Sequence, residues 1–309
     1  MSRDATIAVA IPCYNEAVTI AKVVQDFRAV LPQAAIHVFD NRSTDDSAAR
    51  AREAGATVHH VRRRGKGNVV RAIFDTVVAD AVILVDGDDT YFAEEAPRLL
   101  EPVLSGQVDM VVGDRLEAAD DRSLRRLHQF GNRLIVFAIN AMFRTAYRDI
   151  LSGYRVVSRR FVELVPLLTP GFETETELTL RALTEGLDVM EVPISYRSRP
   201  EGSESKLQSF RDGYRIMLTA VISLRDFYPL RVFGLAGLGC LAVAGGAGLL
   251  RLLGYLGVDT LPTALLTGLL LLFSFTGLLS LGIGLVLNAL NTRSREMIQL
   301  LRRNRRADG

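Results

Sequence analysis

The chain ends in two long stretches without a charged residue, and this feature limits its architecture more than any other. Val232 to Leu250 covers 19 residues, and Leu261 to Thr292 covers 32. About 20 consecutive apolar residues are enough for a helix to cross the hydrocarbon core of a membrane. A short link, Arg251 to Thr260, separates the two stretches. We therefore expect an antiparallel pair of transmembrane helices over residues 231–292, surrounded by membrane lipids.

Basic residues flank this apolar pair at both outer ends. Arg225 and Arg231 precede the first stretch, and six arginines follow the second, at positions 293, 295, 302, 303, 305 and 306. The link carries one basic residue, Arg251, which Asp259 balances. Basic residues concentrate in the cytoplasmic flanks of membrane spans, and the first residues of the chain show no signal-peptide pattern. We expect a cell-membrane protein with two spans, whose amino-terminal domain, basic tail (293–309) and both termini are cytoplasmic.

Apolar residues also recur at helical spacing directly before the first apolar stretch. The recurring residues are Leu207, Phe210, Tyr214, Met217, Leu218, Val221 and Leu224. With charged residues between them, they are typical of an amphipathic helix at the membrane surface, which we expect over residues 206–230. A helix packed on the core of the preceding domain fits the same pattern.

Short apolar runs alternate with helical periodicity in the first half of the chain. The predicted strands are Ile7 to Ile11, Ala35 to Phe39, Thr57 to Val61, Ala81 to Val85 and Met110 to Val112. The predicted helices between them are Ala17 to Val30, Ser47 to Ala54 and Asn68 to Val78. This alternation predicts an α/β domain with a mainly parallel sheet covered by helices on both faces. Two cysteines, Cys13 and Cys240, imply no disulfide framework.

Polar residues follow three of the predicted strands, at Pro12 to Glu16, Asp40 to Ser43 and Asp86 to Asp89. In such sheets, ligands bind outside the carboxyl ends of the strands. The first of these turns contains no glycine, which excludes the glycine-rich turn of a dinucleotide-binding Rossmann unit. Gly65 to Gly67 does not complete a P-loop either. We therefore expect a ligand site of another kind at this edge.

Asp86 and Asp88 stand two residues apart directly after an apolar strand. Carboxylates in this arrangement can converge on one hard divalent cation, Mg²⁺ or Mn²⁺, which would bridge the oxygens of a diphosphate. Acidic turns are also commonplace, so this spacing alone is equally consistent with an ordinary surface turn. Asp40 at the end of the second strand, together with the polar residues after the first, favours the metal site.

Several segments between Ile7 and Lys206 resemble, in order, the family 2 glycosyltransferases of GT-A fold, and among them the polyprenyl (dolichyl) phosphate sugar synthases. Ile11 to Glu16 resembles the segment that surrounds the nucleotide, and Asp149 to Arg155 resembles the D-L-T-S-G-F-R segment of this branch. The other matches are Asp40, Asp86 with Asp88, Gly113-Asp114-Arg115, Gly171-Phe172-Glu173 with Glu177, and Ser205-Lys206. The resemblance implies a GT-A-type, Rossmann-like catalytic domain over residues 1–205, followed by the interface helix and two transmembrane helices.

The resemblance also implies roles for individual residues. The nucleotide-sugar donor would bind at Pro12, Tyr14, Glu16, Asp40, Lys66 and Asp86. Asp86 and Asp88 would hold the divalent cation, and Asp88 would thereby act in catalysis. Many relatives continue D-x-D with Leu-Gln, whose Gln helps to hold the metal. This chain has Asp89-Thr90 there, so Asp89 is the candidate for the third ligand.

Positive side chains have to hold two anionic reactants together. The resemblance makes Arg115, Arg126, Arg199 and Lys206 the candidates, and the arginines among them offer a planar guanidinium fork to phosphate oxygens, although each residue also fits an ordinary surface charge. Glu177 would orient the sugar or act as a helper base, but acidic residues also favour the first turn of a helix. A strong base is less necessary here, because the second pKa of a phosphate monoester is about 6.

These features predict a membrane enzyme that transfers a sugar from UDP-hexose or UDP-N-acetylglucosamine to polyprenyl or dolichyl phosphate, with inversion at the anomeric carbon. The alternatives are a GDP-mannose-dependent polyprenyl-phosphate mannose synthase, a transferase that uses a sugar hydroxyl, and a catalytically silent scaffold or sensor. Hydroxyl-directed enzymes typically carry a Q-x-x-R-W segment, and this chain has no tryptophan. The net charge of +2 gives no indication of nucleic-acid binding. The sequence leaves open whether the chain forms a homo-oligomer.

Overall fold

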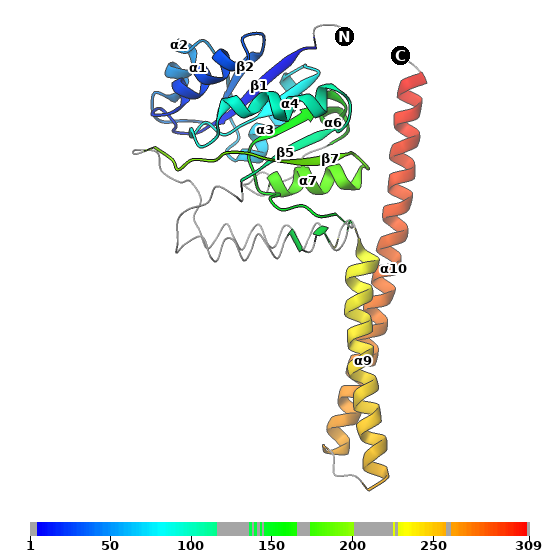
Figure 1. The fold of residues 1–309 in the computed structure, drawn as a ribbon. Coiled ribbons are helices and arrows are strands. Elements are labelled where there is room, and N and C mark those ends of the chain that lie inside the picture. Colours follow the sequence, from blue (N-terminus) through cyan, green and yellow to red (C-terminus); the bar gives the residue numbers. More distant parts are fainter. Residues whose placement is uncertain are drawn as a thin grey trace. The chain divides into compact units, whose positions relative to one another are not determined.

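The computed structural model of the chain describes residues 5–115, 136–137, 139–140, 143, 145–165, 174–200, 225, 228–257 and 261–307. The chain divides into two compact units, Met1–Ala220 and Val221–Gly309. The first unit contains an α/β sheet, and the second contains two long helices (Figure 1). The predicted interface helix (206–230) falls almost entirely outside the described residues.

The first unit is built on a seven-stranded sheet with the order β3-β2-β1-β4-β6-β5-β7. The strands are β1 (Ile7–Cys13), β2 (Ala35–Asp40), β3 (Thr57–His60), β4 (Ala81–Leu84), β5 (Met110–Asp114), β6 (Arg155–Ser158) and β7 (Val189–Pro193). All neighbouring strands are parallel except β6, which runs antiparallel to both β4 and β5. The predicted α/β class with a mainly parallel sheet is confirmed.

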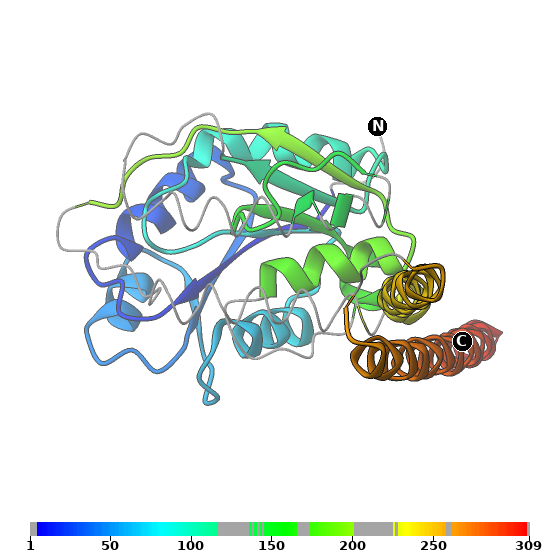
Figure 2. The same ribbon diagram turned by 90° about the horizontal axis from the view of Figure 1, so that it is seen from below.

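Helices cover both faces of this sheet (Figures 1 and 2). They are α1 (Ile20–Val30), α2 (Ser47–Glu53), α3 (Lys66–Thr76), the short 3₁₀ turn Ala93–Glu95, α4 (Ala96–Leu104), α6 (Arg159–Leu164) and α7 (Thr174–Thr184). Side chains alternate along a strand, so Val9 and Ile11 of β1 pack in one core with α1, α2 and α4. Ala8 and Ala10 pack in a second core with α3, α6 and α7. Burying one large apolar side chain in such a core contributes roughly 1.5–3 kcal/mol.

The strands β6 and β7 and the helices α4 and α6 of this unit were not among the elements predicted from the sequence. β6 begins with the buried Arg155, whose charge conceals a strand of four residues. β7 is only half-buried along most of its length, so it shows no continuous apolar run. The first predicted helix starts at Ile20, because the preceding backbone forms a turn in which Thr19 and Ile20 donate to the carbonyl of Glu16.

The second unit consists of α9 (Pro229–Tyr255) and α10 (Thr263–Ala307), which lie side by side and antiparallel (Figure 1). Their backbones approach closely at two glycines, because a Cβ on Gly237 would lie 2.9 Å from the carbonyl oxygen of Gly277. Their apolar windows have mean hydropathies of 1.9 and 2.3, and at most 22% of either window is buried. A core helix of a soluble protein would be mostly buried, so both helices are candidate membrane spans, as predicted.

Candidate functional site

The turns after β1 and β2 are joined by hydrogen bonds that involve no ion pair. The amide of Asn41 donates to the carbonyl of Cys13 at 2.8 Å, and the amide of Asn15 donates to Oγ of Ser43 at 3.0 Å. The amide of Glu16 donates to Oγ of Ser47 at 2.8 Å. These bonds fix the carboxyl ends of the two strands against each other, which brings Pro12, Tyr14, Glu16 and Asp40 to one edge of the sheet.

Asp40, the last residue of β2, is buried at this edge. Its carboxylate accepts from the amide of Ser43 at 3.1 Å and lies 3.1 Å from Nδ1 of His60. Nearby, the guanidinium of Arg64 donates to the hydroxyl of Tyr14 at 2.8 Å and lies over its ring. The predicted nucleotide-binding residues of the first two strands are thus close to the loop that precedes α3.

Asn41 holds that loop. Its side-chain amide donates to the carbonyls of Val61 and Arg63, and its side-chain oxygen accepts from the amide of Gly65 at 2.8 Å. The loop therefore leads directly into Lys66, the first residue of α3. One buried asparagine, which the sequence did not single out, thus connects the end of β2 to the loop that leads into Lys66.

Lys66 lies between two carboxylates from distant parts of the chain. Its Nζ is 2.5 Å from Oδ1 of Asp86 and 2.6 Å from Oε1 of Glu175, at the start of α7. Burial alone would lower the pKa of Lys66, but the two carboxylates raise it above its usual value. Burial would likewise raise the pKa of Asp86, but Lys66, with Arg115 and Arg199, holds it below its usual range. Both groups are therefore charged near neutral pH.

Asp88 and Asp89 are buried next to each other but have different partners. Oδ1 of Asp88 accepts from the hydroxyl of Thr90 at 2.6 Å, and Oδ2 lies 2.5 Å from the guanidinium of Arg199. The carboxylate of Asp89 pairs with Lys22 at 3.2 Å and with Arg197. Asp86 and Asp88 thus each face a predicted phosphate-binding or donor-binding cation, whereas Asp89 faces two other basic residues.

The acidic pair fits a divalent cation that arrives together with a diphosphate. Asp86 and Asp88 offer hard carboxylate oxygens, and Gly153 leaves space for the first of them, because a Cβ there would lie 2.2 Å from Oδ2 of Asp86. Within the ranges that the structure describes, no three His, Cys, Asp or Glu side chains form a metal-binding group. Mg²⁺ is usually held by one or two carboxylates together with waters and substrate phosphates, so two protein ligands suffice.

The segment that contains Gly153 is held by two arginines. Arg115 forms a two-pronged pair with Asp149, from Nε to Oδ2 at 2.7 Å and from Nη2 to Oδ1 at 3.1 Å. Arg155 is fully buried and donates to the carbonyls of Ile150 and Ser152 and, at 2.8 Å, to the hydroxyl of Thr179 in α7. Burial lowers the pKa of Arg155 to about 10. The sequence analysis gave Arg155 no role, because the sequence does not reveal that its guanidinium donates to the carbonyls of Ile150 and Ser152.

The remaining predicted residues are less closely connected to this cluster. Glu177 pairs with Arg181 of the same helix at 2.7 Å. Arg126 and Lys206 lie outside the described residues. Glu175, which stands two residues before Glu177, contacts Lys66 instead, and only the alternation of acidic residues at this helix start indicated it.

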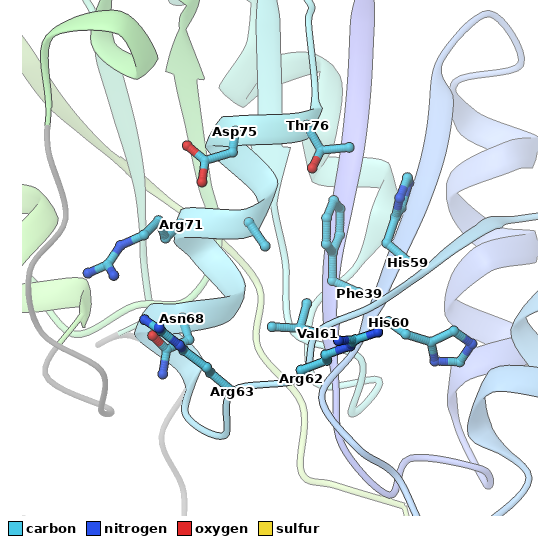
Figure 3. Close-up of a pocket in the computed structure, with 11 residues that line it drawn as sticks. Phe39, His59, His60, Val61, Arg62, Arg63, Asn68, Arg71, Asp75 and Thr76 are labelled. Atoms are coloured by element: carbon cyan, nitrogen blue, oxygen red, sulfur yellow. The ribbon is translucent and has the colours of Figure 1, made fainter.

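Two cavities adjoin the sheet. A small one of about 10 Å³ lies within the acidic and basic cluster and is lined in part by Pro12, Lys66, Asp86 and Glu175. A groove of about 420 Å³ lies between α3 and the β2–β3 edge, where Arg62, Arg63 and Arg71 surround it (Figure 3). We place the candidate site at the cluster of acidic and basic side chains around Asp86 and Asp88, where opposite charges are in contact. The larger groove contains neither of these two residues.

An α/β sheet that presents paired carboxylates and cations at its carboxyl edge is suited to an enzyme that handles phosphorylated ligands. The chain belongs to the family 2 glycosyltransferases, since residues 8–165 match the sequence model described as Glycosyl transferase family 2. It is 37% identical over 244 residues to the glycosyltransferase AglJ of Haloferax volcanii, a match that covers 79% of this chain and 80% of that protein. The chain is therefore a glycosyltransferase, and the predicted family is confirmed.

Two further comparisons concern the branch and the fold. The chain is 30% identical over 210 residues to a dolichyl-phosphate hexose transferase of Haloferax volcanii, which covers 68% of this chain and 90% of that protein. Its fold is similar to a glucosyl-3-phosphoglycerate synthase of Mycobacterium tuberculosis, crystallised with Mn²⁺, UDP-glucose and phosphoglyceric acid. That likeness has a TM-score of 0.57 at 22% identity and covers 72% of this chain and 79% of the other. It supports the predicted GT-A-type fold.

Proposed function

We propose that this glycosyltransferase transfers a hexose or N-acetylglucosamine from its UDP-sugar to polyprenyl or dolichyl phosphate, and that the anomeric carbon is inverted. The observation that carries the proposal is the cluster at the end of β4, where Asp86 and Asp88 face Lys66 and Arg199. A reaction between two anionic reactants needs both charge signs at one place: carboxylates for a cation on the diphosphate, and basic groups for phosphate oxygens. The similarity to a dolichyl-phosphate hexose transferase supports this acceptor.

In the proposed reaction, an oxygen of the acceptor phosphate forms a bond to the anomeric carbon. The bond between that carbon and the diphosphate oxygen breaks, and the nucleoside diphosphate leaves with the bonding electrons. One displacement gives inversion, so an α-linked donor yields a β-linked lipid product. The attacking phosphate is already anionic near neutral pH, because its second pKa is about 6. Glu177 is occupied by Arg181, which fits a reaction that needs no strong base.

A divalent cation, Mg²⁺ or Mn²⁺, would be held by Asp86 and Asp88 and would supply charge neutralisation for the leaving diphosphate. The chain's own residues do the rest. Asp40, Tyr14, Pro12 and Glu16 line the end that we assign to the nucleotide. Thr90 keeps the carboxylate of Asp88 in one orientation by donating to its Oδ1.

Arg199 and Lys66 would exchange partners when the donor binds. Both are paired with site carboxylates in the structure, and each carries donors that suit phosphate oxygens. Arg115 has two of its donors committed to Asp149 and acts on Asp86 through its charge. We therefore assign Arg199 and Lys66 to direct contact with phosphate oxygens. Arg115 would contribute positive charge to the site without contacting the phosphate. Arg126 and Lys206 remain candidates by resemblance.

We further propose that residues 1–205 form the catalytic domain, residues 206–230 an interface helix, residues 231–292 the membrane hairpin and residues 293–309 a cytoplasmic basic tail. The arginines at both outer ends of the hairpin support a cytoplasmic location for the domain and for both termini. A cysteine-accessibility experiment in sealed cells would test the orientation. Cysteines introduced near residues 2 and 309 should react with a membrane-impermeant thiol reagent only after the membrane is made permeable.

The decisive test of the activity is turnover by the full chain in lipid nanodiscs. UDP-glucose, UDP-N-acetylglucosamine and GDP-mannose would each be offered with a short-chain polyprenyl phosphate, and the lipid product identified by mass spectrometry. We expect a product with a UDP-sugar that requires Mg²⁺ or Mn²⁺. A product with GDP-mannose would identify the mannose synthase instead. Sugar transfer to an oligosaccharide, with none to the lipid phosphate, would refute the proposed acceptor.

A further inference from the structure

Asp89 has an unusual backbone conformation at a buried position. Its φ is 59°, in the left-handed region, and its side chain is 6% exposed. Residues other than glycine adopt this region uncommonly, although Asp and Asn do so more readily than most. Such a conformation persists where surrounding contacts determine it, and an observed outlier justifies a search for the function of those contacts.

The contacts of Asp89 come mainly from Arg197, more than one hundred positions later in the chain. Nε of Arg197 donates to the backbone carbonyl of Asp89 at 2.5 Å, and Nη2 pairs with its carboxylate. The guanidinium of Arg197 also lies 4.4 Å from the centroid of the Phe92 ring. A single arginine is thus held by the backbone, the carboxylate and an aromatic ring of the segment that follows β4.

The backbone of the same two segments is joined as well. The amide of Arg197 donates to the carbonyl of Thr90 at 3.0 Å, and Tyr196 forms an antiparallel bridge with Tyr91. Arg199 follows only two residues after Arg197, and its guanidinium lies 2.5 Å from Oδ2 of Asp88. The position of Arg199 at the acidic pair therefore depends on where Arg197 is fastened.

We propose that Asp89 is a positioning residue: with Arg197 it forms a clamp that fastens the segment Tyr196 to Arg199 so that Arg199 reaches the acidic pair. This inference rests on the function proposed above for Arg199. It gives Asp89 a different role from the third metal ligand that the family pattern suggested. Thr90, at the other altered position, orients Asp88 through its hydroxyl.

The two roles of Asp89 make opposite demands. A metal ligand has to turn its carboxylate to the cation, and that of Asp89 would have to leave two basic partners, Lys22 and Arg197, whereas those of Asp86 and Asp88 each face one. A clamp needs the two basic partners to stay in place while Arg199 changes partner. Loss of a metal ligand would raise the Mn²⁺ concentration required, whereas loss of the clamp would lower kcat and loosen the backbone at Arg197 without changing Mn²⁺ affinity.

Asp89→Asn and Arg197→Ala, singly and combined, test the clamp in full-length chain in nanodiscs. Asparagine tolerates the positive φ, so the first variant removes chiefly the charge. We expect each variant to lower kcat about tenfold, equal to about 1.4 kcal/mol, with Mn²⁺ affinity by electron paramagnetic resonance within twofold of the wild type. The double variant should lose no more than the worse single variant. Hydrogen exchange at the backbone amide of position 197 should be faster in all three, after correction for the intrinsic rate of the residue there.

Arg98→Ala is the matched control. Arg98 also joins distant parts of the chain, because it donates to the carbonyl of Pro193, the last residue of β7, at 3.2 Å. It pairs with Glu95 and contacts none of Asp86, Asp88 and Asp89 among the described contacts. Its variant should keep wild-type kcat. Weakened Mn²⁺ binding in Asp89→Asn, or additive losses in the double variant, would overturn the clamp. Exchange and Mn²⁺ binding need no turnover, so an inactive wild type would refute the proposed function while the clamp could still be judged.

Discussion

The ends of β1 and β2 are joined mainly by hydrogen bonds of backbone amides to uncharged acceptors, with no Lys or Arg of the described residues paired to the carboxylates of Asp40 and Asp45 there, whereas the end of β4 is held by ion pairs. At the first place, the amides of Asn41 and Glu16 find the carbonyl of Cys13 and the hydroxyl of Ser47. At the second, Asp86 and Asp88 are neutralised by basic groups from α3 and from the segment after β7. The two halves of one candidate site thus use different interactions.

The difference corresponds to what each half would bind. A base and ribose are neutral and need a surface of fixed shape, which neutral hydrogen bonds supply without responding to charge. Two phosphorylated reactants and a cation change the charge of their surroundings when they bind. Ion pairs that can exchange partners keep such a place neutral both before and after binding, which avoids leaving a buried charge uncompensated. The predictions below test this division, beginning with the largest effect.

The largest effect is expected for Asp88→Asn at the ion-paired half. The variant keeps the shape of the side chain but removes the charge that faces Arg199 and that would hold the cation. We expect kcat to fall by 10²–10³-fold, or about 2.7–4 kcal/mol, the scale found when a preorganised electrostatic partner is removed. Chelation of divalent cations should abolish the activity of the wild type.

Ser47→Ala is the counterpart at the neutral half. It removes the hydrogen bond from the amide of Glu16 and the one that the hydroxyl of Ser47 donates to Oδ1 of Asp45, so we expect a stability loss of about 1–3 kcal/mol and a kcat within threefold of the wild type. Steady-state kinetics of both variants side by side would measure the contrast. Equal losses of kcat would show that the two halves do not differ as described, and full activity of Asp88→Asn in chelator would contradict a metal-dependent reaction.

Gly153→Ala should give the next largest effect. Its Cβ would lie 2.2 Å from Oδ2 of Asp86, which cannot move freely because its carboxylate is paired with Lys66, and Lys66 is itself held by Glu175. A displacement of about 1 Å at a reacting group can cost on the order of 10²-fold in rate, and we expect a 10- to 100-fold loss of kcat/KM for the donor.

Gly87→Ala, beside the same carboxylate, is the control for this variant. Its Cβ would meet Cδ1 of Ile20 at 3.3 Å, which a small movement relieves. We expect a loss of kcat/KM below threefold for Gly87→Ala. If Gly153→Ala bound and turned over the donor normally, the close fit of Asp86 against Gly153 would have no functional meaning.

The sequence predicted the elements and residues whose signal is local. The apolar runs of β1 to β4 placed Asp40, Asp86 and Asp88 at strand ends, and the parallel arrangement of those strands brought the three to one edge. The structure confirms the fold class, but the roles of these residues remain predictions. The two apolar helices could also be predicted from the sequence, because a long stretch without charged residues is recognised without knowledge of its tertiary contacts.

What the sequence did not provide are pairings between distant segments. Lys66 meets Glu175 although 109 positions separate them, and no periodicity records that contact. Asp89 follows the acidic pair directly, yet its positive φ turns it toward Arg197, which the D-x-D spacing alone cannot show. Arg155 is similar, since a buried arginine whose donors reach carbonyls looks in sequence like a surface charge in a strand.

Asn41→Ala is expected to have a moderate effect on donor binding and stability, because Asn41 lies where the ends of β1 and β2 are joined. It would leave the carbonyls of Val61 and Arg63 and the amide of Gly65 without their partner. An unsatisfied buried group costs about 1–3 kcal/mol, which should appear as a lower melting temperature. The loop before Lys66 would loosen, so the KM for the nucleotide-sugar should rise about three- to tenfold while kcat changes little. A fall in kcat at unchanged KM would place Asn41 in the ion-paired half instead.

The smallest effect concerns pH, and it involves a pair of histidines on β2 and β3 that are not among the residues joining the ends of β1 and β2. His37 and His59 share a hydrogen bond of 3.0 Å from Nδ1 to Nε2 beside the buried Phe39, and His59 stacks on the Phe39 ring. Burial lowers the pKa of His37, with the neighbouring His59 adding to the shift, and burial also lowers the pKa of His59. Both rings are therefore neutral in the folded chain near pH 7.

The sign of the effect follows from these lowered pKa values. Below the ordinary histidine pKa of 6.5, the unfolded chain takes up protons that the folded chain does not, so stability falls as the pH decreases from about 7 toward 5. In the ion-paired half, the pKa of Asp86 and that of Asp149 are held below their usual range, despite burial, by Lys66 and Arg115 respectively. Those carboxylates stay charged over this interval and contribute no change.

The melting temperature of His37→Gln should therefore depend less on pH than that of the wild type, while Asn41→Ala should keep the wild-type dependence. An identical pH dependence in His37→Gln and the wild type would mean that folding does not lower the pKa of His37.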